Sequence, residues 1–168
     1  MSYEIRPAVP DDAAAVSSLV HLSFQALGAV NWSSEAMQRF CEESMPSALA
    51  DKLAAALFGA VATSDGTVAG FAMVARPNRL DMLFVHPGHL RKGIGRELWE
   101  AARAHVEAHH RDIKTIELNA TAYARPFYQS VGFVPISLEF EAKGARATRM
   151  ACWLPARQLG AELRPAGP

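Results

Sequence analysis

The stretch "VHPGHLRKGIGREL", residues 85–98, determines how the rest of this chain is interpreted. A hydrophobic run stops at His86-Pro87, and Gly93-Ile94-Gly95 then opens a helical pattern. The first turn of a helix has free backbone N–H groups and the positive end of the helix dipole, and glycines let an anion approach the backbone. Three basic residues add positive charge to the same spot: Arg91, Lys92 and Arg96. The stretch therefore predicts an anion site between a strand and a helix.

Two common nucleotide-binding designs do not fit this loop. A dinucleotide fingerprint needs a glycine three residues after Gly95, and that position is Leu98. A P-loop needs Gly-Lys-Ser/Thr, which the stretch lacks. Two readings remain open from these residues alone: a different phosphate cradle, or a tight turn that binds nothing.

Length, composition and charge limit the classes of partner. The chain has 168 residues and a formal net charge of +0, with a pI of about 7.0. Nucleic acid and anionic membranes are therefore not expected as partners, and an anion site must be local. The two cysteines, Cys41 and Cys152, have no metal-like spacing, which favours a reducing compartment. The N-terminus lacks a signal-peptide layout, and no apolar run reaches the roughly 20 residues that span a bilayer. We expect a cytoplasmic protein.

Periodicity and turn signals predict a single domain over residues 1–168, with a core over about 3–154 and a tail over 155–168. The fold class is α/β (α+β), a mixed sheet covered by helices. An acidic N-cap near Asp12 and a serine start near Ser33 predict the first two helices. In the run 79–85, alternation places Leu80, Met82 and Phe84 on one face, and Asp81, Leu83 and Val85 on the other. The remaining elements follow in order: a helical piece at 47–57, strands at 59–63 and 67–76, a helix to about 110, a strand at 114–120, a helix at 124–133, and two strands within 134–154.

Over residues 3–154 the chain resembles the GNAT superfamily of N-acetyltransferases, which use acetyl-CoA. The family's pyrophosphate loop, Gln/Arg-x-x-Gly-x-Gly/Ala, matches residues 90–95, with Leu90 at the Gln/Arg position. A second family motif, Ala-x-x-x-Tyr-x-x-x-Gly-Phe, matches residues 124–133. The ending "ARATRMACWL" resembles small bacterial members without assigned substrates. The resemblance implies a GNAT-like, mostly antiparallel twisted sheet of six to seven strands flanked by about four helices.

The resemblance also implies acetyl-CoA as co-substrate, held between splayed strands mainly by backbone N–H groups. Family members often have Asn seven residues before the motif tyrosine, where this chain has Thr121, with Asn119 just upstream. The implied acetyl-CoA contacts are Leu83, Phe84, Val85, Leu90, Arg91, Lys92, Gly93, Ile94, Gly95, Arg96, Asn119, Thr121, Ala124 and Phe127.

Acetyl transfer to an amine needs a base and a proton donor. A lysine-like amine has a pKa near 10.4, so only about one molecule in a few thousand is neutral at pH 7. The resemblance places the general acid on Tyr128, which as a phenol is protonated at neutral pH. Asp81 is our candidate base, and Glu117 and His21 are alternatives.

The acceptor is expected to be a small-molecule or peptide amine. The resemblance places its pocket in the first two helical segments, and the residues expected there are Trp32 and Phe24, with Glu117 from the neighbouring strand. No metal is expected, because His105 and His109 have no evident third ligand. Dimers are common in the family, so a homodimer is among the expected states. The alternatives are a non-catalytic CoA-binding or sensing module on the same fold, and a structural or interaction protein that binds no CoA.

Overall fold

The computed structural model describes residues 3–27, 32–142 and 144–155, which form a seven-stranded sheet and five α-helices. The strands are β1 (Glu4–Pro7), β2 (Phe58–Ser64), β3 (Thr67–Ala75), β4 (Arg79–Val85), β5 (Thr115–Ala120), β6 (Val134–Ala142) and β7 (Ala145–Trp153). The helices are α1 (Ala13–Leu27), α2 (Ser34–Glu43), α3 (Pro46–Ala55), α4 (Ile94–His109) and α5 (Arg125–Ser130). The described part of the chain includes no helix long and apolar enough to cross a membrane.

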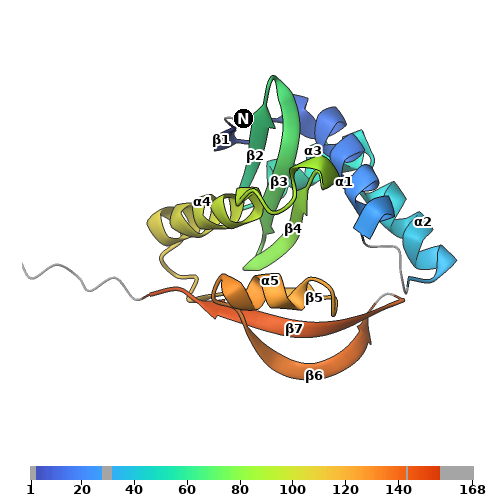
Figure 1. Cartoon of the computed structure of the whole chain (residues 1–168). Coiled ribbons are helices and arrows are strands. Elements are labelled where there is room, and N and C mark those ends of the chain that lie inside the picture. The colour runs from blue at the N-terminus through green and yellow to red at the C-terminus, as the bar shows by residue number, and fades with distance from the viewer. Residues whose placement is uncertain (1–2, 28–31, 143, 156–168) are drawn as a thin grey trace, which may run out of the picture.

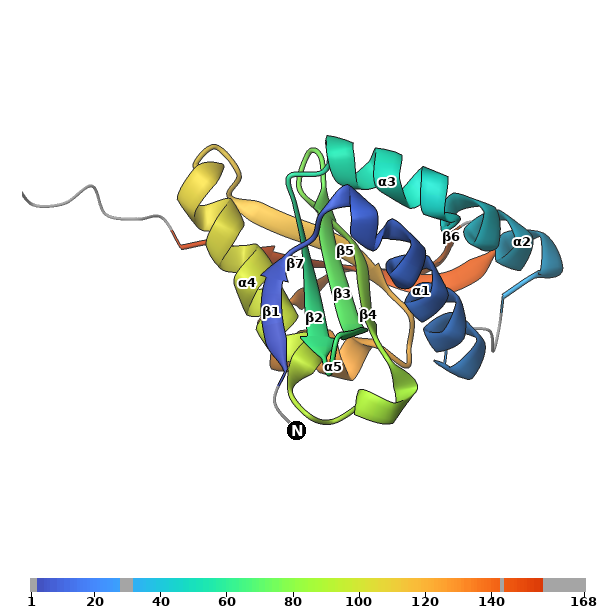
Figure 2. The same ribbon diagram turned by 90° about the horizontal axis from the view of Figure 1, so that it is seen from above.

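The sheet order is β1-β2-β3-β4-β5-β7-β6, and every pair is antiparallel except β4 with β5. Figure 1 shows β2–β4 running across the direction of β5–β7, so the sheet is strongly twisted. Figure 2 shows α4 on one face of β2–β4 and α1 and α3 on the other. The predicted mixed, mostly antiparallel sheet is confirmed. The segment predicted at 47–57 contains α3, at Pro46–Ala55, so the described residues form five α-helices where about four were expected.

The described part of β4 and β5 meets at one end only. Their register holds a single residue pair, Arg79 with Glu117, and the Glu117 N–H donates to the Asn78 carbonyl oxygen over 2.9 Å. The Asn78 amide also donates to the Thr115 carbonyl oxygen over 3.0 Å. Beyond these contacts no further β4–β5 pairing occurs among the described residues, and the two strands splay apart. This splay opens the sheet toward the ends of β4 and β5, where α4 begins and α5 lies.

A bulge in β4 corrects the predicted alternation. Met82 pairs with Met73, but the next pair is Leu80 with Val74, so Asp81 is an extra residue on β4. Met82 therefore packs in the core under α1, whereas Leu80 packs in the core under α4. The prediction that Leu80 shares a face with Met82 and Phe84 was wrong, because simple alternation assumes an unbroken ladder.

Small residues bring the first turns of α4 close to the sheet. A Cβ on Gly70 of β3 would lie 2.8 Å from both Ile94 Cγ2 and Leu98 Cδ1. Four alanines of β2 and β3 form the rest of this contact: Ala60, Ala62, Ala69 and Ala72. Ile94 and Leu98 are fully buried against them. This close packing fixes the position of the N-terminal end of α4 relative to β4.

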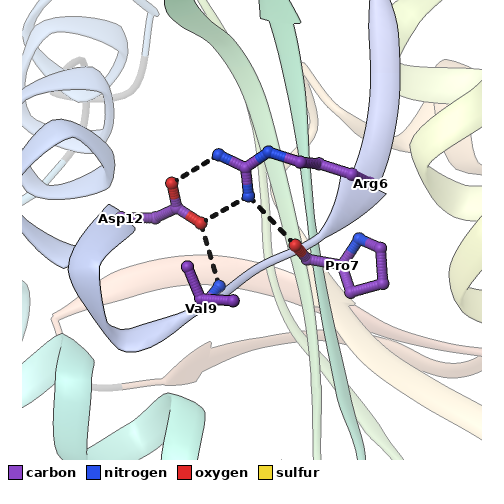
Figure 3. A network of polar contacts seen from close by, with 4 residues as sticks. All are labelled: Arg6, Pro7, Val9 and Asp12. Carbon is purple, nitrogen blue, oxygen red and sulfur yellow. Dashed lines mark hydrogen bonds and ion pairs between the residues drawn. The ribbon is translucent and has the colours of Figure 1, made fainter.

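The entry to α1 differs from the predicted acidic N-cap. A short 3-10 turn at Pro10–Asp12 precedes α1, and Val9 is its N-cap residue. The Asp12 carboxylate accepts from the Val9 N–H over 2.9 Å and from both terminal nitrogens of Arg6 over 2.7 and 2.8 Å. Figure 3 shows this network joining β1 to the turn. The Arg6 guanidinium holds the pKa of Asp12 below its ordinary value, against the opposing effect of burial.

We expect Asp12→Ala to lower the free energy of unfolding by about 1–2 kcal/mol at pH 7, because it removes a cap and a bidentate charged contact. A folded-state pKa below the unfolded value means that this stabilisation is complete above about pH 4 and is lost as the carboxylate becomes protonated in acid. Urea unfolding at pH 7 and at pH 3 measures the difference. The control variant is Asp11→Ala, because Asp11 is the exposed residue next to Asp12. Equal stability of the two variants at pH 7 would contradict the assignment.

Candidate active site

A cavity of about 760 Å³ lies where β4, the start of α4 and α5 meet. Leu83 and Val85 contribute from β4, and Phe127 and Tyr128 contribute from α5. The loop before α4 and the first turn of that helix also line the cavity: His89, Leu90, Arg91, Gly93, Ile94, Gly95 and Arg96. The cavity therefore joins the stretch that opened the sequence analysis to the second motif, more than 30 residues later.

The start of α4 presents a row of free backbone donors. Gly93 is the N-cap with φ +86°, and the first helical bond runs from the Glu97 N–H to the Gly93 carbonyl oxygen over 3.1 Å. The N–H groups of residues 94–96 consequently have no acceptor in the helix itself. Arg91, at φ +60°, also has left-handed backbone geometry. Such a turn before a helix N-terminus is a common anion-binding arrangement in proteins.

Side chains hold this loop in place. His86 Nδ1 accepts from the Gly88 N–H over 3.0 Å. Lys92 Nζ turns back to the Gly88 carbonyl oxygen over 3.2 Å. From the other end of the chain, the Tyr3 hydroxyl donates to Glu97 Oε1 over 2.6 Å. The backbone of the loop is thus fixed before any ligand arrives, which lowers the entropic cost of binding.

Tyr128 lies on the opposite wall of the cavity, on α5. Its ring packs edge-on against Phe127 and Phe133, with centroid separations of 5.3 and 5.6 Å. Among the described residues its hydroxyl has no hydrogen-bond partner. Burial raises the pKa of Tyr128 to about 12, so the phenol is protonated throughout the physiological range. The side chain is half-buried and lines the cavity, so it can offer a proton to a group bound there.

Residues 29–154 match the family model described as "Acetyltransferase (GNAT) domain". The chain belongs to the GNAT family of acetyltransferases. The match covers both motifs, all of β2–β7 and helices α2–α5. It therefore includes every residue that lines the cavity.

Solved structures of GNAT proteins have the same fold. A GCN5-related N-acetyltransferase from Rhodopseudomonas palustris, named as a class-II aminotransferase, is 25% identical with a TM-score of 0.77, over 92% of this chain and 97% of that one. PaiA N-acetyltransferase from Thermoplasma acidophilum, solved with coenzyme A, is 20% identical with a TM-score of 0.73, over 91% and 99%. The ribosomal-protein-S18-alanine N-acetyltransferase from Escherichia coli is 24% identical with a TM-score of 0.65, over 96% and 99%. No curated protein sequence gave a significant match.

Most of the residues predicted to contact acetyl-CoA are brought together in this GNAT fold. The following predicted contacts line the cavity: Leu83, Val85, Leu90, Arg91, Gly93, Ile94, Gly95, Arg96, Ala124 and Phe127. Gly95 lies between strand and helix, where an added Cβ would be at ordinary contact distance, 3.4 Å from the Phe127 ring and 3.5 Å from Val85. The first motif therefore lies beside the second one.

Four other predicted contacts lie outside the cavity lining. The Phe84 side chain lies on the opposite face of β4, 6.0 Å from the Phe40 ring between centroids. The Lys92 side chain is turned back to Gly88. The Thr121 carbonyl oxygen accepts the Ala124 N–H at the entry to α5. Asn119, on β5, has a buried Oδ1 without a hydrogen-bond partner among the described residues, and it lies on the face opposite the buried Leu118.

Four residues line the cavity that the sequence did not single out: His89, Tyr123, Pro126 and Ser130. Tyr123 is 67% exposed, which is unusual for a large aromatic side chain beside a motif. Ser130 ends α5, where its carbonyl oxygen accepts from Arg96 over 3.2 Å. That contact ties the first turn of α4 to α5. The sequence offers one signal for two of these residues: Tyr123 and Ser130 lie next to or within the tyrosine motif.

The residues predicted for the acceptor and for the base lie outside the lining of this cavity. Trp32 and Phe24 meet edge to face with centroids 4.8 Å apart. Asp81, in the bulge, has its carboxylate 3.8 Å from Arg79 Nε. Glu117 is half-buried on β5 beside the same end of the splay. His21 Nε2 lies 3.3 Å from the Cys41 carbonyl oxygen, so this ring is engaged between α1 and α2.

The histidine pair on α4 is a stacked arrangement. The His105 ring stacks on His109 at 4.2 Å and on Phe58 at 4.1 Å between centroids. Burial, and next the nearby His109 and His110, lower the pKa of His105. Within the ranges that the structure describes, no group of three or more His, Cys, Asp or Glu side chains is placed to hold a metal ion.

Proposed function

We propose that this protein is an acetyl-CoA-dependent N-acetyltransferase that moves the acetyl group directly to a primary amine. One observation carries the proposal: a cavity at the β4–β5 splay has free backbone donors at one wall and the Tyr128 phenol at the other. Backbone N–H donors can bind phosphate, and a phenol can donate a hydrogen bond to a departing thiolate. Both lie in a chain of the GNAT family.

The α4 N-terminus would bind the pyrophosphate. Its donors are backbone N–H groups within residues 91–96, and the exposed Arg91 side chain adds positive charge. Leu90 occupies the position where the family has Gln or Arg. Because the binding groups belong to the backbone, a leucine there leaves the clamp complete.

Tyr128 would assist the leaving sulfur. In the reaction the amine nitrogen bonds to the carbonyl carbon, the carbon–sulfur bond breaks, and one proton passes from nitrogen to sulfur. A phenol with a pKa of about 12 is a weaker acid than a thiol, whose pKa is about 8.5. Tyr128 would therefore stabilise the departing sulfur by donating a hydrogen bond. Transfer of the phenol proton to sulfur would occur only together with return of a proton from the substrate nitrogen to the phenol. Neither Cys41 nor Cys152 lines the cavity, which fits direct transfer without an acyl-enzyme.

Asp81 would accept, directly or through water, the proton that the ammonium form of the substrate must lose before the neutral amine attacks. We expect Asp81→Asn to lower kcat at pH 7 about a hundredfold, because the proton acceptor is lost, and Glu117→Gln to keep kcat within about twofold of the wild type. Steady-state rates with saturating acetyl-CoA measure both. Full activity of Asp81→Asn together with a large loss in Glu117→Gln would transfer the role to Glu117.

Release of free thiol from acetyl-CoA, measured against a broad panel of amines, tests the proposed function. Amine-dependent thiol release is the expected result. Tight binding of acetyl-CoA without turnover on any amine would instead indicate a sensing module on the same fold. No thermal shift with acetyl-CoA would indicate a structural or interaction protein.

A further inference from the structure

Asn119, on β5, has a buried oxygen that the fold leaves unused. Its Oδ1 is buried and has no hydrogen-bond partner among the described residues. Buried polar atoms in native proteins nearly always have such a partner, so an exception needs its own explanation. The cross-strand neighbour on β7 is Arg149, but its guanidinium lies over the Phe140 ring, 6.0 Å from the ring centroid. The described residues therefore leave one acceptor oxygen for a donor that they do not supply.

Asn119 lies in the part of β5 that has separated from β4. The last pair of these two strands is Arg79 with Glu117, and Asn119 is two residues farther along β5. Its neighbours Leu118 and Ala120 belong to the core under α4. The Asn119 side chain therefore faces the other side of the sheet, which over β4 is the side that α1 covers (Figure 2).

The cofactor cavity and Asn119 flank the splay from opposite sides of the sheet. Leu83 and Val85 line the cavity on the α4 side of β4. A thioester at the splay would have Tyr128 on the cavity side and the Asn119 oxygen on the other. The thioester group has no N–H or O–H, so it cannot donate to this oxygen. Glu117, on the same face as Asn119, has a carboxylate without an ion pair among the described residues, which favours a cationic donor there.

We infer that Asn119 binds the acceptor amine and selects primary over secondary amines. The inference rests on the proposed function. A primary ammonium group has three N–H bonds. One proton passes to Asp81, a second reaches the departing sulfur, and the third stays on the nitrogen of the amide product. That third N–H donates to Asn119 Oδ1 from binding to product. A secondary ammonium group has two N–H bonds and loses both protons, so the buried oxygen is left without a donor.

A matched pair of amines tests this selection. Thiol release is measured with the most active primary amine of the panel and with its N-methyl derivative. We expect kcat/KM for the primary amine to exceed that for the N-methyl derivative at least about tenfold, because the second substrate leaves a buried polar group unpaired.

Two substitutions of similar size separate hydrogen bonding from steric exclusion. Asn119→Leu removes the acceptor oxygen, and it should raise KM for the primary amine about tenfold and reduce the preference to less than about threefold. Asn119→Asp keeps an acceptor oxygen in the same place and should keep the preference. The Kd for acetyl-CoA should be unchanged in both variants. Asn119→Leu should unfold at the wild-type temperature or higher, since a buried unpartnered oxygen is removed.

A titration without turnover observes the same contact. The side-chain amide signal of Asn119 is followed by NMR in isotope-labelled protein with CoA present, and its loss in Asn119→Leu identifies it. Methylammonium, which has three N–H bonds on nitrogen, should shift this signal saturably. Tetramethylammonium has the same charge and no N–H bond, and it should leave the signal in place.

Three outcomes would overturn the inference and leave the proposed function standing. A preference that persists in Asn119→Leu would make the exclusion of secondary amines steric. Weaker acetyl-CoA binding in Asn119→Leu with an unchanged amine KM would assign the oxygen to the pantetheine amides. Equal shifts with the two ammonium ions would show a response to charge alone. If no amine is acetylated, the proposed function fails, and the methylammonium titration still reports whether Asn119 binds an ammonium group.

Discussion

Replacement of Tyr128 by phenylalanine should lower kcat about a hundredfold while KM and Kd for acetyl-CoA change less than about twofold. The ring that packs against Phe127 and Phe133 is retained in this variant, so the cavity keeps its shape. Only the hydroxyl is lost. It has no hydrogen-bond partner among the described residues, so we expect the fold to be unchanged. Steady-state thiol release and calorimetric titration of acetyl-CoA measure the two quantities separately.

The raised pKa of Tyr128 adds a second expectation for the same pair of proteins. Because burial moves that pKa from about 10 to about 12, the phenol stays protonated at alkaline pH. The wild type should therefore show no loss of kcat from this group below about pH 11. Unchanged kcat in Tyr128→Phe would contradict the assignment of the proton donor.

Replacement of Gly93 by valine should reduce acetyl-CoA affinity at least about a hundredfold, because the loss of two or more hydrogen bonds to a charged group is expected. At φ +86° a β-branched residue is strained, and the loop must change to relieve it. Crowding is not the cause, since a Cβ there would be 3.6 Å from the Tyr3 hydroxyl, an ordinary contact. The N–H groups at the start of α4 would then no longer converge.

Two controls separate clamp geometry from general destabilisation. Gly66→Val places the same strain, at φ +77°, in the β2–β3 turn, where a Cβ would meet nothing within 4 Å. It should lower thermal stability and leave acetyl-CoA affinity unchanged. Leu90→Gln restores the family residue and should also leave affinity unchanged. Wild-type affinity in Gly93→Val, or a large gain in Leu90→Gln, would contradict a clamp made of backbone groups.

The local features of the site could be predicted from sequence because they depend on short-range rules. Glycines before a helix, a strand ending at His86-Pro87, and a tyrosine motif on a short helix each act within one or two turns of chain. Their meeting in one cavity depends on Gly70, the alanines of β2 and β3, and the hydrogen bond from Arg96 to Ser130. Neither periodicity nor composition contains that information, and only the family resemblance supplied it.

The bulge at Asp81 shows where pattern reasoning failed. Regular alternation of the two faces was expected along 79–85 from the sequence. In the structure, however, Leu80 and Met82 face opposite sides of the sheet, because Asp81 between them has no partner residue on β3. The acceptor side was predictable only in part. Trp32 and Phe24 were expected there, but the pairing of α2 with the tip of the β6–β7 hairpin near Gly144 joins segments over 100 residues apart.

We propose that acetyl-CoA binds through backbone N–H groups at the start of α4, with its thioester facing Tyr128. Amide chemical shifts of the labelled protein, followed during titration with acetyl-CoA, test this most directly. We expect the largest shifts on residues 91–96 and a second set of shifts on residues 124–128. Saturable shifts centred on another surface, or no shifts at millimolar acetyl-CoA, would contradict it.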